Sequence, residues 1–232
     1  MIEAAYRDLT DSIRYSQHIQ QAVVPDTILL DRYTAGHFLL HRPKDFVSGD
    51  LPWCAPVEGR TVWAVADHTG HGVPGALMSI LGCTLLHGVV VEQRVDRPAE
   101  ILDRLREAVI RALQRPGRQG PQDGMDIGIC ALDHRTGTLR FAGAMHPIYR
   151  VRGRELTDVA GDRMPVGLMP EAGCPFTEHT LDVRPGDMLY LCSDGLQDQL
   201  GGPADRKCGR TRLKELLADI AAMPMQDQLH RV

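Results

Sequence analysis

The sequence predicts an α+β domain in which two antiparallel sheets pack face to face, with helices on the outside. Short β-branched and apolar runs follow one another across turns, in a chain with 23 glycines and 15 prolines. Consecutive runs of this kind form antiparallel hairpins rather than βαβ units. Two helical segments separate the early strands from the late ones. A length of 232 residues fits one such domain with a short extension.

The first expected element is a helix over residues 2–23, ended by Pro25. Steps of four and three residues give it a heptad seam with two polar members: Ile2, Tyr6, Leu9, Ile13, Ser16, Gln20 and Val23. Two interpretations stay open. The helix is a coiled-coil stub that continues an upstream sensor or dimerisation element, or it is an amphipathic helix packed on its own domain. We assign residues 1–25 to this linker and 26–232 to the main domain.

The remaining elements follow from periodicity and turn residues. Strands are expected at 33–42, 61–67, 126–133, 138–143, 148–152, 178–183 and 187–193, and helices at 75–91, 97–113 and 210–222. The helix at 75–91 is expected to become extended near Gly88. The strand at 148–152 is expected to pair with the one at 138–143, and 115–124 to form a flexible loop.

Composition excludes several classes of protein. A net charge of −4 argues against a general nucleic-acid binder. Charges in the first 17 residues argue against a signal peptide, and we expect no membrane span because no long apolar run is evident. The six cysteines lack zinc-site spacing. We therefore expect reduced thiols and a cytoplasmic location.

Several aspartates lie beside glycines at the ends of predicted strands: Asp50, Asp67, Asp123, Asp126 and Asp194. Any one of them could be an ordinary turn residue or helix cap. Strand ends gather at the ends of a sheet sandwich, so we expect Asp50, Asp67 and Asp194 to converge. Carboxylate and carbonyl oxygens suit Mg²⁺ and Mn²⁺. Two bridged cations activate a shared water for hydrolysis of a phosphate ester.

Nearby side chains extend this hypothesis. His71 or His68 could protonate the leaving oxygen, and Arg42 and Lys44 could bind the phosphate. The alternatives are turn histidines and a solvated surface pair.

The same glycine-rich turn also satisfies G-x-G-x-x-G through Gly70, Gly72 and Gly75, with Glu92 about 20 residues on. A pyrophosphate there would lie close to the Asp67 carboxylate, and hairpins follow instead of βαβ units. A dinucleotide-dependent oxidoreductase is therefore the remote alternative.

Together these segments resemble the PPM (type 2C) metal-dependent serine/threonine phosphatases, and within them the bacterial SpoIIE-like branch. The similar segments follow the family's order along the chain: SIRYSQHIQQAVVP (12–25), RPKDFVSGD (42–50), VADHTGHGVPGALMSILG (65–82), DGMDI (123–127), LRFAGAMHP (139–147), GDRMPVGL (161–168) and GDMLYLCSDGLQDQLGG (186–202).

The resemblance implies an αββα sandwich with two Mn²⁺ or Mg²⁺ ions. It implies that Asp67 bridges the metals, that the His68 carbonyl and Asp194 are ligands, and that Asp50 acts through water. Asp126 or Asp123 would hold a looser third ion. It also implies a phosphoprotein substrate in a bacterial signalling pathway, such as a STAS anti-sigma-factor antagonist. An upstream receiver, HAMP or sensor module would precede the first helix. A homodimer could form through that helix.

One departure from the family pattern concerns the C-terminal end. The family closes with a strand carrying a further aspartate in a D-D-x-T pattern, whereas the late aspartates here, Asp219 and Asp227, lie outside any such pattern. Fewer carboxylates weaken a hard-metal site. This motivates the alternative of a pseudophosphatase that binds a partner without turnover.

Overall fold

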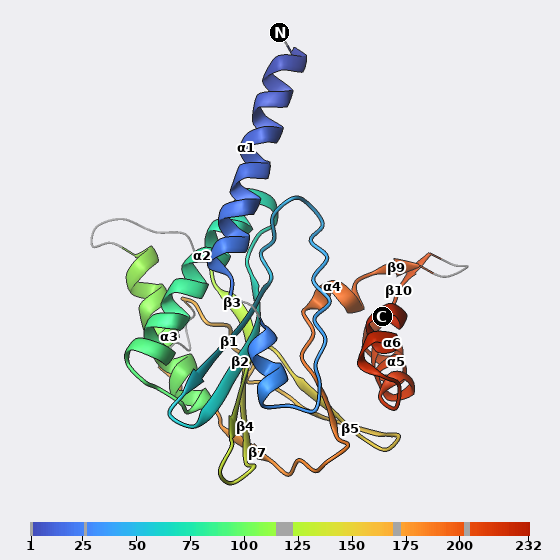
Figure 1. Ribbon diagram of the computed structural model, residues 1–232. Helices are drawn as coiled ribbons and strands as arrows, with labels where there is room; N and C mark the ends of the chain where they lie inside the picture. The colour runs from blue at the N-terminus through green and yellow to red at the C-terminus, as the bar shows by residue number, and fades with distance from the viewer. Residues whose placement is uncertain (1, 26, 115–122, 169–172, 202–204) are drawn as a thin grey trace.

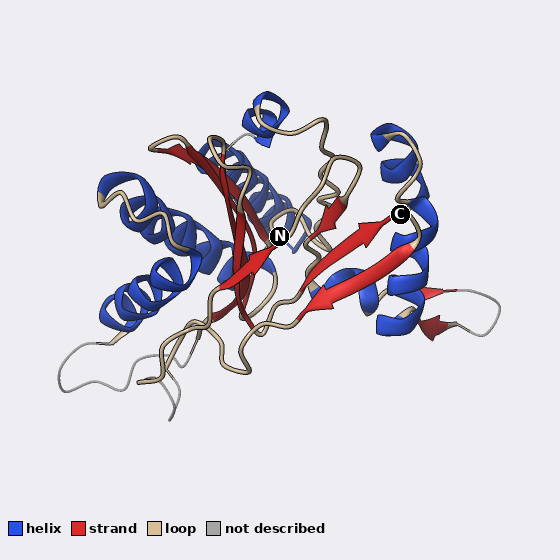
Figure 2. Cartoon of the chain, turned by 90° about the horizontal axis from the view of Figure 1, so that it is seen from below, coloured by secondary structure: helices blue, strands red, loops and turns tan. Residues whose placement is uncertain are grey.

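The computed structural model describes residues 2–25, 27–114, 123–168, 173–201 and 205–232 (Figure 1). Most of the loop predicted at 115–124 lies outside these residues. Two main antiparallel sheets face each other, with helices on the outer side of each (Figure 2). The α+β class and the layered arrangement are therefore confirmed.

The larger sheet has five strands in the order β1-β2-β3-β4-β7. They are β1 (Leu51–Val57), β2 (Arg60–His68), β3 (Met125–Asp133), β4 (Leu139–Ala144) and β7 (His179–Leu181). The β1–β2 hairpin turns through Glu58 and Gly59, with φ of 45° and 80°. Two positive φ values in a two-residue turn match the twist of the flanking strands.

The prediction of a strand at 33–42 is wrong, because these residues lie outside every strand. The first strand is β1, which the sequence reading missed. Pro52 and Pro56 interrupt its pattern, and proline cannot donate to a sheet ladder. β1 is an edge strand of its sheet, where such residues are tolerated. It packs against a short 3₁₀ helix, η1 (Thr27–Arg32).

The smaller sheet has the order β6-β5-β8, formed by β5 (Ile148–Arg152), β6 (Glu155–Val159) and β8 (Met188–Tyr190). The expected pairing of β5 with β4 is wrong, since β5 pairs with β6 and β8. Between β4 and β5 the chain turns at Met145, which has a φ of 56°, and Pro147 cannot extend a ladder. This turn moves the chain from one sheet to the other.

Helices cover both sheets. α2 (Gly72–His87) and α3 (Pro98–Leu113) lie on the larger sheet, and α5 (Gly209–Ile220) and α6 (Met225–Arg231) lie beside the smaller one (Figure 2). The remaining short elements are α4 (Asp194–Gln197), β9 (Leu200–Gly201) and β10 (Arg206–Lys207). The described part of the chain thus has the αββα layers that the resemblance implies.

The prediction that the helix becomes extended at Gly88 is wrong. It continues as a π-helical turn, η2 (Gly88–Glu92). The expectation that the chain has no long apolar run is wrong, because the helical stretch Gly72–Glu92 is long and apolar enough to cross a membrane by length and composition alone. Half of it is buried inside the domain. Leu86, Val89 and Val90 belong to the main hydrophobic core, as in a core helix.

α1 (Ile2–Val23) projects away from the sheets (Figure 1). Ile2, Tyr6 and Leu9 are 88%, 71% and 60% exposed, and only the last turns of the helix contact α2. Most of the heptad seam is therefore uncovered within this chain. That arrangement disfavours the interpretation of a helix packed along its own domain.

Candidate metal centre

Two carboxylates lie directly opposite each other on neighbouring strands of the larger sheet. Asp67 is near the end of β2 and Asp126 near the start of β3, and the register pairs them. Side chains of directly paired residues share one face of a sheet, about 5 Å apart at Cβ, where like charges repel. The strand register thus creates an unfavourable pair that a cation would relieve.

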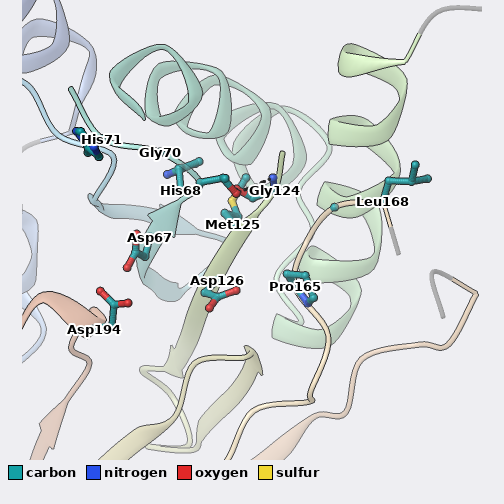
Figure 3. Close-up of a pocket in the computed structure, with 12 residues that line it drawn as sticks. Asp67, His68, Gly70, His71, Gly124, Met125, Asp126, Pro165, Leu168 and Asp194 are labelled. Carbon is teal, nitrogen blue, oxygen red and sulfur yellow. Dashed lines mark hydrogen bonds between the residues drawn. The ribbon is translucent and has the colours of Figure 1, made fainter. Parts of the chain in front are cut away.

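Two further carboxylates reach the same place from other elements. Asp50 precedes β1, and its Oδ2 accepts a hydrogen bond from Ser193 Oγ at 3.1 Å. Asp194 follows Ser193 as the first residue of α4, after the smaller sheet's β8. Figure 3 shows the carboxylates of Asp67 and Asp194 facing each other, with Asp126 nearby on β3. The four acids therefore come from both sheets.

The pKa values of two of these acids reflect this crowding. The pKa of Asp67 is raised to about 7, chiefly by burial and in addition by the neighbouring carboxylates of Asp50, Asp194 and Asp126. Burial also raises the pKa of Asp126, with a contribution from Asp194. Within the described residues, none of the four acids forms an ion pair with lysine or arginine.

The donor chemistry of this group fits Mg²⁺ or Mn²⁺, which favour carboxylate oxygens. The carboxylates lie farther apart than the ligands of a bound ion would, since no three His, Cys, Asp or Glu side chains in the described ranges are arranged to hold one. We define Asp50, Asp67, Asp126 and Asp194 as the carboxylate cluster. It is a set of suitable donors held around a common space.

The two candidate histidines occupy different surroundings. The His68 side chain is 2% exposed, with Nδ1 2.7 Å from the Gly49 carbonyl oxygen. Burial lowers its pKa to about 4, so the ring is neutral and packed beneath the site. His71 is exposed on the pocket rim, with Nδ1 3.9 Å from Asp45 Oδ2.

The segment before Asp50 carries the other predicted residues and one that was missed. Arg42 and Lys44 are exposed, and neither is among the residues that line the pocket described below. His41 lies near enough to Asp50 for that carboxylate to raise its pKa, although desolvation lowers it overall. No sequence pattern distinguishes His41, since its position depends on the path of a segment outside the strands.

An open pocket of about 500 Å³ lies next to the carboxylate cluster, with Asp67, Asp126 and Asp194 on one side (Figure 3). Pro165, Gly167 and Leu168 line the opposite side. The backbone of Val166 is fixed there by reciprocal hydrogen bonds with Met125, at 3.0 and 2.9 Å.

The pocket wall is also anchored to α3. The Arg106 guanidinium lies 4.7 Å from the Phe176 ring centroid and donates to Asp103 Oδ1 at 2.9 Å. Asp103 also accepts from the Phe176 backbone N–H. Asp162 accepts from both the N–H and the hydroxyl of Thr177. These contacts hold both ends of the segment that carries Pro165 and Leu168.

The glycine-rich turn at 70–75 joins β2, a strand of an antiparallel sheet, to α2. A dinucleotide-binding turn belongs to a parallel sheet. The oxidoreductase alternative is therefore wrong.

Comparisons with known proteins agree with this architecture. The family model for stage II sporulation protein E (SpoIIE) matches residues 57–232. The SiaA-PP2C domain of Pseudomonas aeruginosa is 31% identical, with a TM-score of 0.86 over 98% of this chain and 88% of that chain. Comparison with curated protein sequences found no match.

Two more distant structures share the fold. The RsbU and RsbW domains of Rv1364c from Mycobacterium tuberculosis give a TM-score of 0.63 at 21% identity, over 83% of this chain and 51% of that one. The PP2C phosphatase domain of SpoIIE from Bacillus subtilis, with a fragment of its regulatory domain, gives a TM-score of 0.59 at 18% identity, over 80% of this chain and 54% of that chain. With the layered fold and the family match, these findings establish that the chain belongs to the SpoIIE family of PP2C-type serine/threonine phosphatases.

Proposed function

We propose that this chain is a metal-dependent phosphatase that hydrolyses phosphoserine or phosphothreonine in a protein substrate. One observation carries the proposal: four carboxylates from two sheets converge beside an open pocket, and the pKa of Asp67 is raised to about 7. Such a group is poorly stable without a cation. The family is metal-dependent, and carboxylates are the donors that Mg²⁺ and Mn²⁺ prefer.

In this proposal Asp67 and Asp194 hold two divalent ions, Asp50 contributes through water, and Asp126 binds a weaker third ion. The His68 main-chain carbonyl adds a neutral oxygen. Bound divalent cations would supply Lewis acidity that activates water and offsets phosphoryl charge.

The remaining roles fall to side chains around the pocket. His71, on its rim, donates a proton to the leaving oxygen. Arg42 and Lys44 bind the phosphate or its flanking peptide.

The biological setting is part of the same proposal. The substrate is a phosphorylated STAS-type protein in the cytoplasm, and an upstream sensor or receiver module connects through α1. The exposed seam of α1, led by Ile2, Tyr6 and Leu9, supports a homodimer formed through residues 1–25. Size-exclusion chromatography with light scattering tests the dimer. A monomer at high concentration would contradict it.

A second candidate is a pseudophosphatase that binds a phosphoprotein without turnover. It is supported by the loose spacing of the acids among the described residues. A metal-loaded chain that binds the phosphoprotein and leaves its phosphate intact would favour this candidate.

Manganese-dependent release of phosphate from p-nitrophenyl phosphate and from a phospho-STAS protein tests the main proposal. Asp67→Asn and Asp194→Asn should each abolish turnover, whereas Asp219→Asn should leave it unchanged, because Asp219 is exposed on α5. Turnover that persists in both cluster variants would contradict the assignment.

A further inference from the structure

The pocket wall, residues 164–168, takes the place of β4 beside the start of β3. β4 ends at Ala144, which pairs with Ile127. Two residues earlier on β3, Met125 instead forms an antiparallel bridge with Val166 through two reciprocal backbone hydrogen bonds. This bridge fixes which residue of the wall lies opposite each residue of β3.

The register places Pro165 opposite Asp126. In an antiparallel ladder the pair that follows a hydrogen-bonded pair has its Cα atoms about 4.5 Å apart and its side chains on one face. That face also carries Asp67, the partner of Asp126 on β2. Figure 3 shows Pro165 next to Asp126, on the side away from Asp194. Asp67, Asp126 and Pro165 therefore form one row, which changes from charged to apolar at its third member.

The wall alternates between the core and the pocket. Met164 and Val166 are 9% and 0% exposed and belong to the main hydrophobic core, so the side chain between them faces the other way. A Cβ on Gly167 would lie 3.1 Å from the Gly124 Cα, and the backbone of the wall therefore packs closely against the start of β3. The Pro165 ring is thus held in place before a substrate binds.

The length of the row indicates which part of a substrate meets Pro165. Neighbouring strands lie about 4.8 Å apart, so Pro165 is about 10 Å from Asp67. An extended peptide advances about 3.3 Å per residue. A peptide that runs along the row from a phosphorylated residue at the carboxylate cluster therefore places a residue about two or three positions away against Pro165.

We infer that Pro165 is a specificity-determining residue, which selects phosphoproteins with an apolar side chain two or three positions from the phosphorylated residue. The inference rests on the proposed function and names the class of substrate for that site. An apolar side chain against the proline ring leaves water without losing hydrogen bonds. A polar side chain there loses water and gains no partner from the ring.

Steady-state hydrolysis of two phosphoserine peptides by the whole Mn²⁺-loaded chain tests the inference. The peptides differ only at the second and third residues on each side of the phosphoserine, which are leucine in one and asparagine in the other. Apolar contacts in protein pockets discriminate between substrates by about tenfold or more, and wild type should prefer the leucine peptide about tenfold in kcat/KM. Pro165→Asn should reduce this ratio to within about twofold, because it removes the apolar surface.

Three further variants separate the apolar surface from other effects. Pro165→Val keeps an apolar side chain suited to an extended segment and should retain the preference. Pro165→Thr has the shape of valine with a hydroxyl and should give a lower ratio than Pro165→Val; this pair carries the test if Pro165→Asn fails to fold. Leu200→Asn removes an exposed leucine on β9, away from the residues that line the pocket, and should leave both kcat/KM values unchanged.

The outcomes are distinguishable. Equal kcat/KM for the two peptides in wild type overturns the inference alone, and so does a preference that persists in Pro165→Asn. An equal loss of preference in Pro165→Val or Leu200→Asn also overturns it, because the effect would then not follow the apolar surface of the wall. A wild-type chain that hydrolyses neither peptide contradicts the proposed function, and this inference with it.

Discussion

Replacing Asp67 by asparagine should stabilise the metal-free protein while abolishing metal binding. Asp67 is half-buried, pairs across the strands with Asp126, and lies near Asp50 and Asp194. Its pKa is raised from 3.8 to about 7, so at pH 8 the side chain is ionised despite its burial and the repulsion of its neighbours. Asparagine keeps the shape and removes the charge.

The magnitude follows from that pKa. A shift of this size corresponds to about 4 kcal/mol if it is fully realised, and solvent screening of a partly exposed group reduces this to about 1–2 kcal/mol. For a domain of this length the gain should raise the Tm by about 5 °C. The assay is thermal unfolding at pH 8 in EDTA, with Asp219→Asn as the control that leaves the Tm unchanged.

Adding Mn²⁺ should reverse the order of stabilities. Ligand binding stabilises the folded state by an amount that grows with the logarithm of the ratio of ligand concentration to Kd, so the Tm of wild type should rise and that of Asp67→Asn should not. An Asp67→Asn protein that is less stable than wild type in EDTA would refute the electrostatic reasoning. So would one that Mn²⁺ stabilises as much as wild type.

Two further outcomes follow from the packing and charge of the site. Gly82→Ala should lower the free energy of unfolding by about 2–3 kcal/mol, because a Cβ there would lie 2.2 Å from His68 Nε2. Gly88→Ala is the control, since the atom nearest to its Cβ would be 3.8 Å away. Chemical denaturation should show that Gly88→Ala changes the free energy of unfolding by no more than about 1 kcal/mol. The unfolding free energy of the metal-free chain should contain a contribution that falls between about pH 4 and 7, because folded Asp67 retains a proton that the unfolded chain releases. Comparing wild type with Asp67→Asn across this range isolates that contribution, and one that rises with pH would contradict the raised pKa.

The sequence predicted those parts of the fold whose pattern is local. The strand at 61–67 and the helix at 97–113 are found as β2 and α3, within a residue or two at each end, because their periodicity and turn residues leave few alternatives. β1 was missed since Pro52 and Pro56 look unlike strand residues unless the strand lies at an edge. Edge position is a property of the sheet as a whole.

In the candidate site, too, the sequence predicted the features that follow from local pattern and missed those that depend on contacts between distant segments. Convergence of Asp50, Asp67 and Asp194 could be expected because strand ends meet at the ends of a sandwich. The contacts of His68 and Gln20 could not be predicted from the sequence. His68 is oriented by Gly49 and Gln20 pairs with Ser48, contacts that only the assembled layers create.

The central claim is that the carboxylate cluster holds the catalytic cations. Anomalous diffraction at the manganese edge, from crystals grown with Mn²⁺, tests it most directly. The account predicts two peaks beside the pocket, both within bonding distance of Asp67 and one also of Asp194. Full-occupancy Mn²⁺ elsewhere, with no density between these carboxylates, would contradict it.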